Sequence, residues 1–285
     1  MIWPAAVSGD PSHRVGLTLT RMSESSEQRE SLAAQAAQLV SMIMSANTVV
    51  VLTGAGVSTE SGIPDFRGPD GLWLDRELEE FAQIDTFHRD PALTWTFYRD
   101  RLHTMRGLQP NPGHFALAEL EQLGIVRAII TQNVDGLHTA AGSKLVLEMH
   151  GSLRVAVCQS CRREVGIQVA IEDLDPEQGR LPRCLVCPAR PVLKPGVVLF
   201  GELMPPALDE AQALLGDCEL LIVCGSSLQV FPVAGMPEIV RSNQGKVAIV
   251  NKGETGYARA ELWIDAVTGE LLPLVVRQLN SSRPA

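Results

Sequence analysis

Hydrophobic residues recur along the chain in two patterns, and these patterns alternate. Residues 27–46 predict an amphipathic helix, because apolar side chains recur there at helical spacing, at Leu32, Leu39, Val40 and Ile43. Short, mainly apolar runs predict buried strands at 48–52, 126–130, 220–224 and 247–250. Further helices are expected at 112–123, 207–216 and 233–243. Strands that alternate with helices predict an α/β fold, with a parallel sheet covered on both faces.

Two segments interrupt this alternation. Residues 69–108 look helical and rich in aromatic anchors, whereas residues 153–192 show little core-like periodicity. The first helix, the first strand and a glycine-rich turn follow one another as at the opening of a nucleotide-binding fold. We therefore expect a flexible tail at residues 1–26 and a Rossmann-like nucleotide-binding domain built from residues 27–68, 109–152 and 193–280. A smaller part would be made of a helical insert, residues 69–108, and a second insert that holds four cysteines, residues 153–192.

Composition narrows the choice of partners. The chain has 285 residues, of which 45% are hydrophobic, so a sizeable core is expected. Its net charge is −9 and no basic stripe is visible, which argues against direct binding to nucleic acid. An acidic surface suits a lysine-bearing protein partner, although it also serves solubility alone. The sequence has neither an apolar run long enough for a membrane helix nor the pattern of a secretory signal.

Four of the six cysteines form two closely spaced pairs, Cys158 with Cys161 and Cys184 with Cys187. Two such pairs separated by 22 residues are typical of two knuckles that hold one tetrahedral zinc ion. Four thiolates leave no open coordination position, so we expect the zinc to be structural. This use of cysteine also indicates a reducing compartment, and we expect a cytoplasmic protein. Cys218 and Cys224 lie in or near apolar runs and are interpreted as core thiols.

Polar and glycine residues follow several of the predicted strands. Gly54 and Gly56 follow the first strand, where two glycines let the backbone approach a phosphate. A dehydrogenase fingerprint would require glycine at Thr59, so hydride transfer is disfavoured. Asn133 and Asp135 follow the second strand, where an amide and a carboxylate suit a nicotinamide and ribose hydroxyls. A plain turn explains each of these motifs equally well when it is taken singly.

Five motifs, in this order, resemble the signature of the sirtuin family. The resemblance covers residues 45–275, with the cysteine pairs in the expected place, and rests on Gly54–Gly68, Thr131–His138, His150–Gly151, Pro195–Glu202 and Gly225–Leu228. It implies a protein lysine deacylase that consumes NAD and carries one structural zinc. The expected protein partners are acyl-lysine proteins.

The resemblance also implies roles for individual residues. His150 would be the general base and Asn133 a second catalytic residue. The residues implied in NAD binding are Gly54, Ala55, Gly56, Ser58, Asp65, Phe66, Arg67, Trp73, Gln132, Asn133, Asp135, Gly225, Ser226, Ser227 and Asn251. The family usually has threonine at the position of Ser226, and serine keeps the hydroxyl. Val198 and Phe200 would line the acyl-lysine tunnel, and the backbone of Gly201 and Glu202 would pair with the substrate strand.

The resemblance implies a mechanism as well. The acyl carbonyl oxygen would attack the nicotinamide-bearing ribose carbon, and His150 would then take a proton from a ribose hydroxyl. Water would complete the transfer of the acyl group to ADP-ribose. A mono-ADP-ribosyltransferase shares the first step, and a non-enzymatic, zinc-stabilised NAD-binding module is a second alternative. The remaining histidines, His138 and His114 among them, are interpreted as structural or surface groups.

Tyr98 and Arg101 are spaced to project from one face of a predicted helix. A phenol beside a guanidinium can clamp a carboxylate, and this pattern resembles the sirtuin subgroup that removes succinyl and malonyl groups. The alternative is a surface helix on which Arg101 faces solvent. Because residues 64–70 look more like a general deacetylase, we expect deacetylation together with clamp-dependent desuccinylation.

Overall fold

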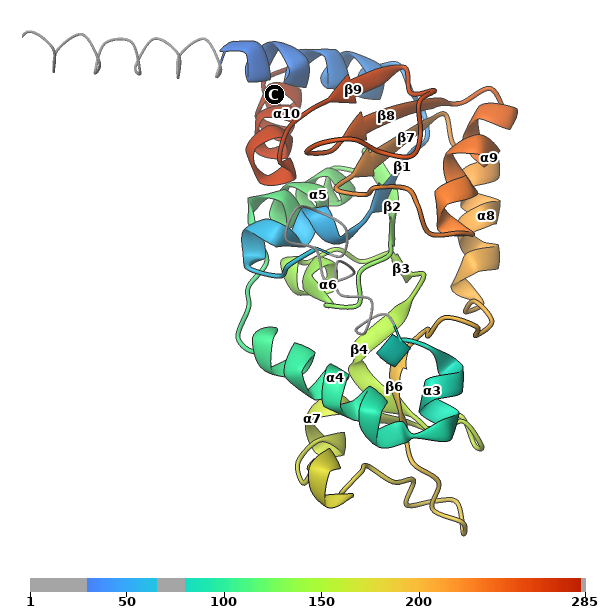
Figure 1. The fold of residues 1–285 in the computed structure, drawn as a ribbon. Helices are drawn as coiled ribbons and strands as arrows, with labels where there is room; N and C mark the ends of the chain where they lie inside the picture. Colours follow the sequence, from blue (N-terminus) through green and yellow to red (C-terminus); the bar gives the residue numbers. More distant parts are fainter. Residues whose placement is uncertain (1–29, 66–79, 283–285) are drawn as a thin grey trace, which may run out of the picture.

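Six parallel strands form the central sheet of the larger part of the molecule (Figure 1). The computed structural model describes residues 30–65 and 80–282. Across the sheet the strands lie in the order β3 (Val146–Glu148), β2 (Val126–Thr131), β1 (Val49–Thr53), β7 (Leu220–Cys224), β8 (Lys246–Val250) and β9 (Leu262–Ile264). Every residue of β1 and β7 is buried, because helices cover both faces of the sheet. This is why these strands are continuous apolar runs in the sequence.

Helices pack on both faces of this sheet. Residues 30–44, α5 (Pro112–Gln122) and α10 (Thr268–Ser282) share one core cluster, which includes Leu39 and Leu117. On the other face, α8 (Ala207–Gly216) and α9 (Met236–Ser242) pack against a second cluster. The predicted α/β fold with a parallel Rossmann-like sheet is confirmed. The sequence pattern did not indicate α10, because Gly269 and Pro273 interrupt its first turns.

The smaller part of the molecule combines segments that are distant in sequence (Figure 1). Its antiparallel sheet has the order β5 (Glu164–Gly166), β4 (Gly151–Val157) and β6 (Lys194–Val197). Packed with it are α3 (Ile84–Arg89), α4 (Pro91–Thr104) and α7 (Ile167–Ala170), and η3 (Pro176–Gln178) contacts α4. The indole nitrogen of Trp95 in α4 donates to the carbonyl oxygen of Leu193, 2.8 Å away. Sequence periodicity did not predict this sheet, because β5 is only three residues long and its neighbour β4 mixes buried with partly exposed residues.

The strand order reverses at the centre of the large sheet. From β1 the chain continues to β2 and β3 on one side, whereas β7 continues to β8 and β9 on the other. Between β1 and β7 the connections therefore diverge, and a crevice opens at the carboxyl ends of these two strands. The short elements η1 (Ala55–Ser61), α6 (Leu137–Ala141) and η4 (Val233–Gly235) complete the described chain. In the described residues, no helix is long and apolar enough to span a membrane.

Candidate functional site

A cavity of about 740 Å³ occupies the crevice at this point of the sheet. Its walls come from the loops that follow β1, β2, β7 and β8, and from α4 and the segment after β6 in the smaller part. Both parts of the molecule therefore contribute to a single site.

Two glycine turns touch each other at the base of the cavity. The amide of Gly56 donates to the carbonyl oxygen of Gly225 over 2.8 Å. A β-carbon on Gly54 or Gly56 would approach backbone atoms of Gly225 to 2.8 Å, so neither position has room for a side chain. Gly225 has φ +57°, and a β-carbon there would lie 2.3 Å from the amide nitrogen of Val57. These glycines thus bring the ends of β1 and β7 together and keep side chains away from the base of the cavity.

Ser58 joins three other polar residues beside these turns. Its hydroxyl donates to Oδ2 of Asp135 at 2.7 Å. The same oxygen accepts a hydrogen bond from the side-chain amide nitrogen, Nδ2, of Asn133 at 3.1 Å. The Asp135 carboxylate also accepts the backbone N–H of Leu137 through Oδ1 at 2.8 Å. Nε2 of His114 lies 3.4 Å from the Ser58 oxygen. The side chains of Asn133 and Asp135 are therefore held in fixed orientations at the end of β2.

His150 lies at the end of β3 and lines the same cavity. Its Nδ1 atom is 3.1 Å from the carbonyl oxygen of Gln132. A carbonyl only accepts, so Nδ1 carries the ring proton and Nε2 of the neutral imidazole is left with a lone pair. Burial lowers the pKa of His150, and the bond to Gln132 opposes this shift only in part. The neutral, proton-accepting form is therefore favoured.

Tyr98 and Arg101 line the cavity from α4, opposite the loops of the large sheet. Burial raises the pKa of Tyr98, so its phenol stays protonated and can donate a hydrogen bond. Burial lowers the pKa of Arg101, and the nearby Tyr98 and Asp135 oppose this shift. Because the ordinary pKa of a guanidinium is very high, the Arg101 side chain keeps its positive charge. The spacing predicted from the sequence thus places both groups in the cavity, and Arg101 does not simply face solvent.

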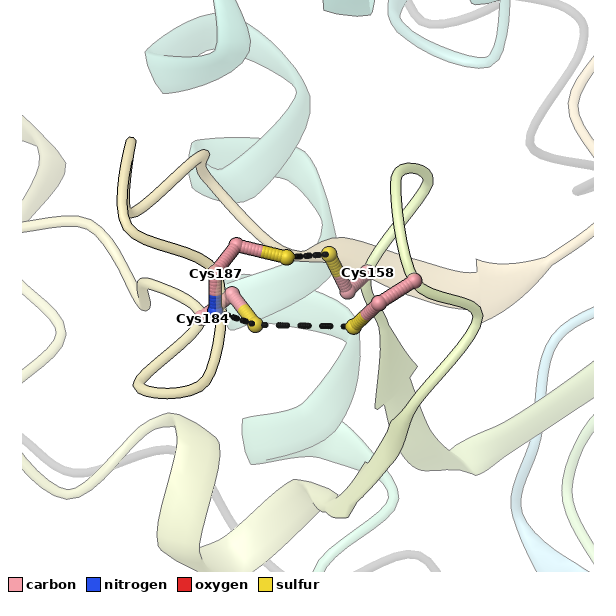
Figure 2. A group of neighbouring side chains, drawn as sticks. Cys158, Cys184 and Cys187 are labelled. Atoms are coloured by element: carbon pink, nitrogen blue, oxygen red, sulfur yellow. Dashed lines mark hydrogen bonds between the residues drawn. The ribbon is translucent and has the colours of Figure 1, made fainter.

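The four paired cysteines meet in the smaller part (Figure 2). Sγ of Cys158 is 3.8 Å from that of Cys187, and Cys161 and Cys184 are separated by the same distance. All four sulfur atoms lie within 4.8 Å of one another. A tetrahedral site with Zn–S bonds of about 2.3 Å has sulfur–sulfur edges of about 3.8 Å. These distances fit zinc and are far too long for disulfide bonds.

Comparisons with known proteins agree with this arrangement. The profile of the Sir2 family matches residues 54–232. The NAD-dependent protein deacetylase of Sulfolobus acidocaldarius is 41% identical over 252 residues, which cover 88% of this chain and 97% of that protein. The NAD-dependent protein deacylase 1 of Archaeoglobus fulgidus is 41% identical over 247 residues, or 86% of this chain and 98% of that one. The chain belongs to the Sir2 family.

Solved structures of Sir2 proteins share the fold. A Sir2 complex with a p53 peptide and NAD⁺ has a TM-score of 0.76 and 36% identity, covering 86% of this chain and 98% of the other. A Sir2 complex with a deacetylated p53 peptide and 3′-O-acetyl ADP ribose has a TM-score of 0.79 and 37% identity, covering 85% and 97%. The predicted family, fold class and NAD dependence are thereby confirmed, and the four clustered cysteines are consistent with the predicted structural zinc.

The predicted site residues of this Sir2-family protein come together in the cavity. Among the described residues, every residue predicted to act in catalysis, NAD binding or substrate binding lines this cavity. They include Ala55, Asp65, Ser227, Asn251 and Gly201. Phe66, Arg67 and Trp73 lie outside the described residues.

Sequence reasoning overlooked two contacts of this Sir2 site. His114 was interpreted as structural or as a surface group, yet its imidazole reaches Ser58 while Nδ1 accepts the N–H of Asn111 in a capping box. The spacing of Asn111 and His114 was the available signal. Lys194 lies behind the cavity wall, 2.9 Å from Glu202, and no local sequence feature indicates that pairing.

Proposed function

We propose that this Sir2-family protein removes acyl groups from protein lysines and transfers them to the ADP-ribose of NAD. One observation carries this proposal. A single cavity holds the glycine turns, the proton-accepting face of His150 and the wall formed by Val198 and Phe200.

The large-sheet side of the cavity suits NAD. Gly54, Gly56 and Gly225 carry no side chains and line the cavity, so a diphosphate can approach the backbone there. Asn133 and Asp135 offer an amide and a carboxylate to the nicotinamide and the ribose hydroxyls, and the bonds to Ser58 fix both side chains beforehand. Gln132 donates to Oγ of Ser226 over 2.8 Å, which ties the β2 and β7 ends of the site together. NAD supplies the ribose that receives the acyl group.

His150 is the proposed general base. Because Nδ1 donates to Gln132, the imidazole is held with Nε2 available for a ribose hydroxyl proton. Burial lowers the pKa of His150, so the base stays neutral at pH values somewhat below the ordinary pKa of histidine. The backbone carbonyl of His150 also accepts the N–H of Val198 at 2.8 Å, so the base and the acyl-lysine wall are fixed relative to each other.

Tyr98 and Arg101 give the cavity a cationic, hydrogen-bonding end. The terminal carboxylate of a succinyl or malonyl group would accept a hydrogen bond from the Tyr98 phenol and pair with the Arg101 guanidinium. An acetyl group needs neither. We therefore infer that acidic acyl groups are accepted through these two residues and acetyl without them.

Mass spectrometry of an acyl-lysine peptide incubated with and without NAD tests the proposal. Acyl loss only with NAD, together with free acyl-ADP-ribose, is the expected result. ADP-ribose attached to protein would instead identify a mono-ADP-ribosyltransferase. Absence of any NAD cleavage would identify a binding module.

A further inference from the structure

The cavity wall after β6 is an irregular segment that needs support from outside. All residues from Val197 to Glu202 line the cavity. Beyond β6, the backbone is held by the bond from Val198 to His150 and by two bonds between Phe200 and residues 82–84. These bonds fix the middle of the segment. Its turn at Gly201 and Glu202 has one backbone bond, in which the N–H of Glu202 donates to the carbonyl oxygen of Leu199 over 3.0 Å.

A buried ion pair closes that turn. Lys194 is 6% exposed, and its Nζ atom lies 2.9 Å from Oε2 of Glu202. The same ammonium donates to the carbonyl oxygens of Pro195, at 3.0 Å, and Val197. An ammonium has three protons, so all three are used within this one segment.

The Glu202 carboxylate is also tied to the wall itself. Its Oε2 atom accepts the backbone N–H of Leu199 at 2.8 Å. Lys194, just before the segment, and Glu202 at its end are thus joined to each other and to three backbone groups between them. The carboxylate lies close enough to the cavity to raise the pKa of Tyr98, although burial raises it more.

Stability alone is a poor reason for such a pair. A buried ion pair is often no more stabilising than apolar side chains of similar volume, because both charges must leave water. Its directional bonds do fix geometry, and here they fix one wall of the cavity.

We propose that Lys194 is a positioning residue that locks Glu202 against the segment from Val197 to Glu202 and so sets the shape of the acyl-lysine wall. This inference rests on the proposed deacylase function. Lys194 lies behind the wall and does not line the cavity itself.

Steady-state kinetics of Lys194→Met, Lys194→Arg and Lys246→Met separate positioning from a merely structural role. Lys246 is an exposed lysine at the start of β8, outside the cavity, and serves as the matched control. We expect Lys194→Met to raise the KM for an acetyl-lysine peptide by roughly tenfold or more and to leave the dissociation constant for NAD nearly unchanged. Lys194→Arg, which keeps the charge and the donors, should recover much of the loss. An unchanged peptide KM, or equal weakening of peptide and NAD binding, would overturn the proposal.

Hydrogen exchange gives a readout that does not depend on activity. In Lys194→Met, the amides of Leu199 and Glu202 should exchange faster, whereas those of the loop from Gly54 to Ser58 should not change. If Lys194→Met does not fold, Glu202→Gln removes the charge at nearly constant shape and should show the same local loosening. Unchanged exchange at Leu199 and Glu202 in the folded variant would rule out the positioning role of Lys194. A wild-type protein without deacylase activity would refute the proposed function instead, and the exchange result would still decide the role of Lys194.

Discussion

The imidazole of His150 is held by the backbone of Gln132, with Nδ1 lying 3.1 Å from its carbonyl oxygen. Because Gln132 directly follows β2 and His150 lies two residues after β3, two neighbouring parallel strands fix the base. The bond selects the tautomer with the proton on Nδ1 and leaves Nε2 free to accept a proton.

This relationship predicts a specific loss of turnover. His150→Ala should lower kcat for deacetylation by about 100-fold or more, the usual consequence of losing a general base, while NAD still binds. Steady-state kinetics at saturating substrate measure kcat, and calorimetric titration measures the binding of NAD. Normal turnover in His150→Ala would remove the residue from the mechanism.

The pH profile gives a second check on the same base. His150 must be neutral to accept a proton, and burial lowers its pKa. The acidic limb of the kcat profile should therefore fall below the ordinary histidine pKa of about 6.5. A limb clearly above that value would mean that His150 is not the group that titrates.

Zinc removal should affect the smaller part of the molecule. Cys184→Ala leaves three thiolates, and structural zinc sites contribute on the order of 10 kcal/mol, so metal content and thermal stability should both collapse. Cys218→Ala is the matched control, because Cys218 is also buried but belongs to a core cluster of the large sheet. Elemental analysis after gel filtration checks both variants. A stable Cys184→Ala protein with full activity would contradict the structural role.

Arg101 should discriminate between acyl groups. Arg101→Met removes the cationic partner of a succinyl carboxylate, a loss of about 2 to 5 kcal/mol in a dry pocket, and leaves acetyl contacts in place. Arg99→Met is the control: Arg99 lies on the same helix but pairs with Asp100 and Glu177 outside the cavity. Ratios of kcat/KM for succinyl and acetyl peptides give the answer. Equal loss of both activities in Arg101→Met would refute the clamp.

Buried histidines predict acid sensitivity of the fold. Burial lowers the pKa of His138 to about 3 and that of His114 to about 4. Below a pH of about 6.5 the unfolded chain takes up protons that the folded protein refuses, so stability falls as pH falls. For His138 this amounts to something on the order of 2 kcal/mol at pH 5.

Urea unfolding of His138→Gln and wild type, at several pH values, tests this sensitivity. The variant should lose less unfolding free energy than wild type between neutral pH and pH 5. Any loss of zinc at low pH affects both proteins alike and does not change this difference. His103→Gln, an exposed position on α4, should behave like wild type. Parallel curves for His138→Gln and wild type would show that His138 does not contribute.

The sequence predicted the parts of this molecule that depend on local pattern. The apolar runs of β1 and β7 indicated buried parallel strands, and paired cysteines indicated zinc, because each signal lies within a few residues. The pairing of Ser58 with Asp135 joins residues 77 positions apart, and only the fold shows it. The same holds for Lys194, whose role depends on where the cavity lies.

The stoichiometry of nicotinamide release tests the central claim most directly. Nicotinamide and deacylated peptide are quantified together in one reaction of wild-type protein with NAD and an acetyl-lysine peptide. The single cavity that joins the NAD side to the acyl-lysine wall predicts one nicotinamide for each acyl group removed, with every acyl group recovered on ADP-ribose. Nicotinamide release without loss of the acyl group, or deacylation without NAD, would contradict it.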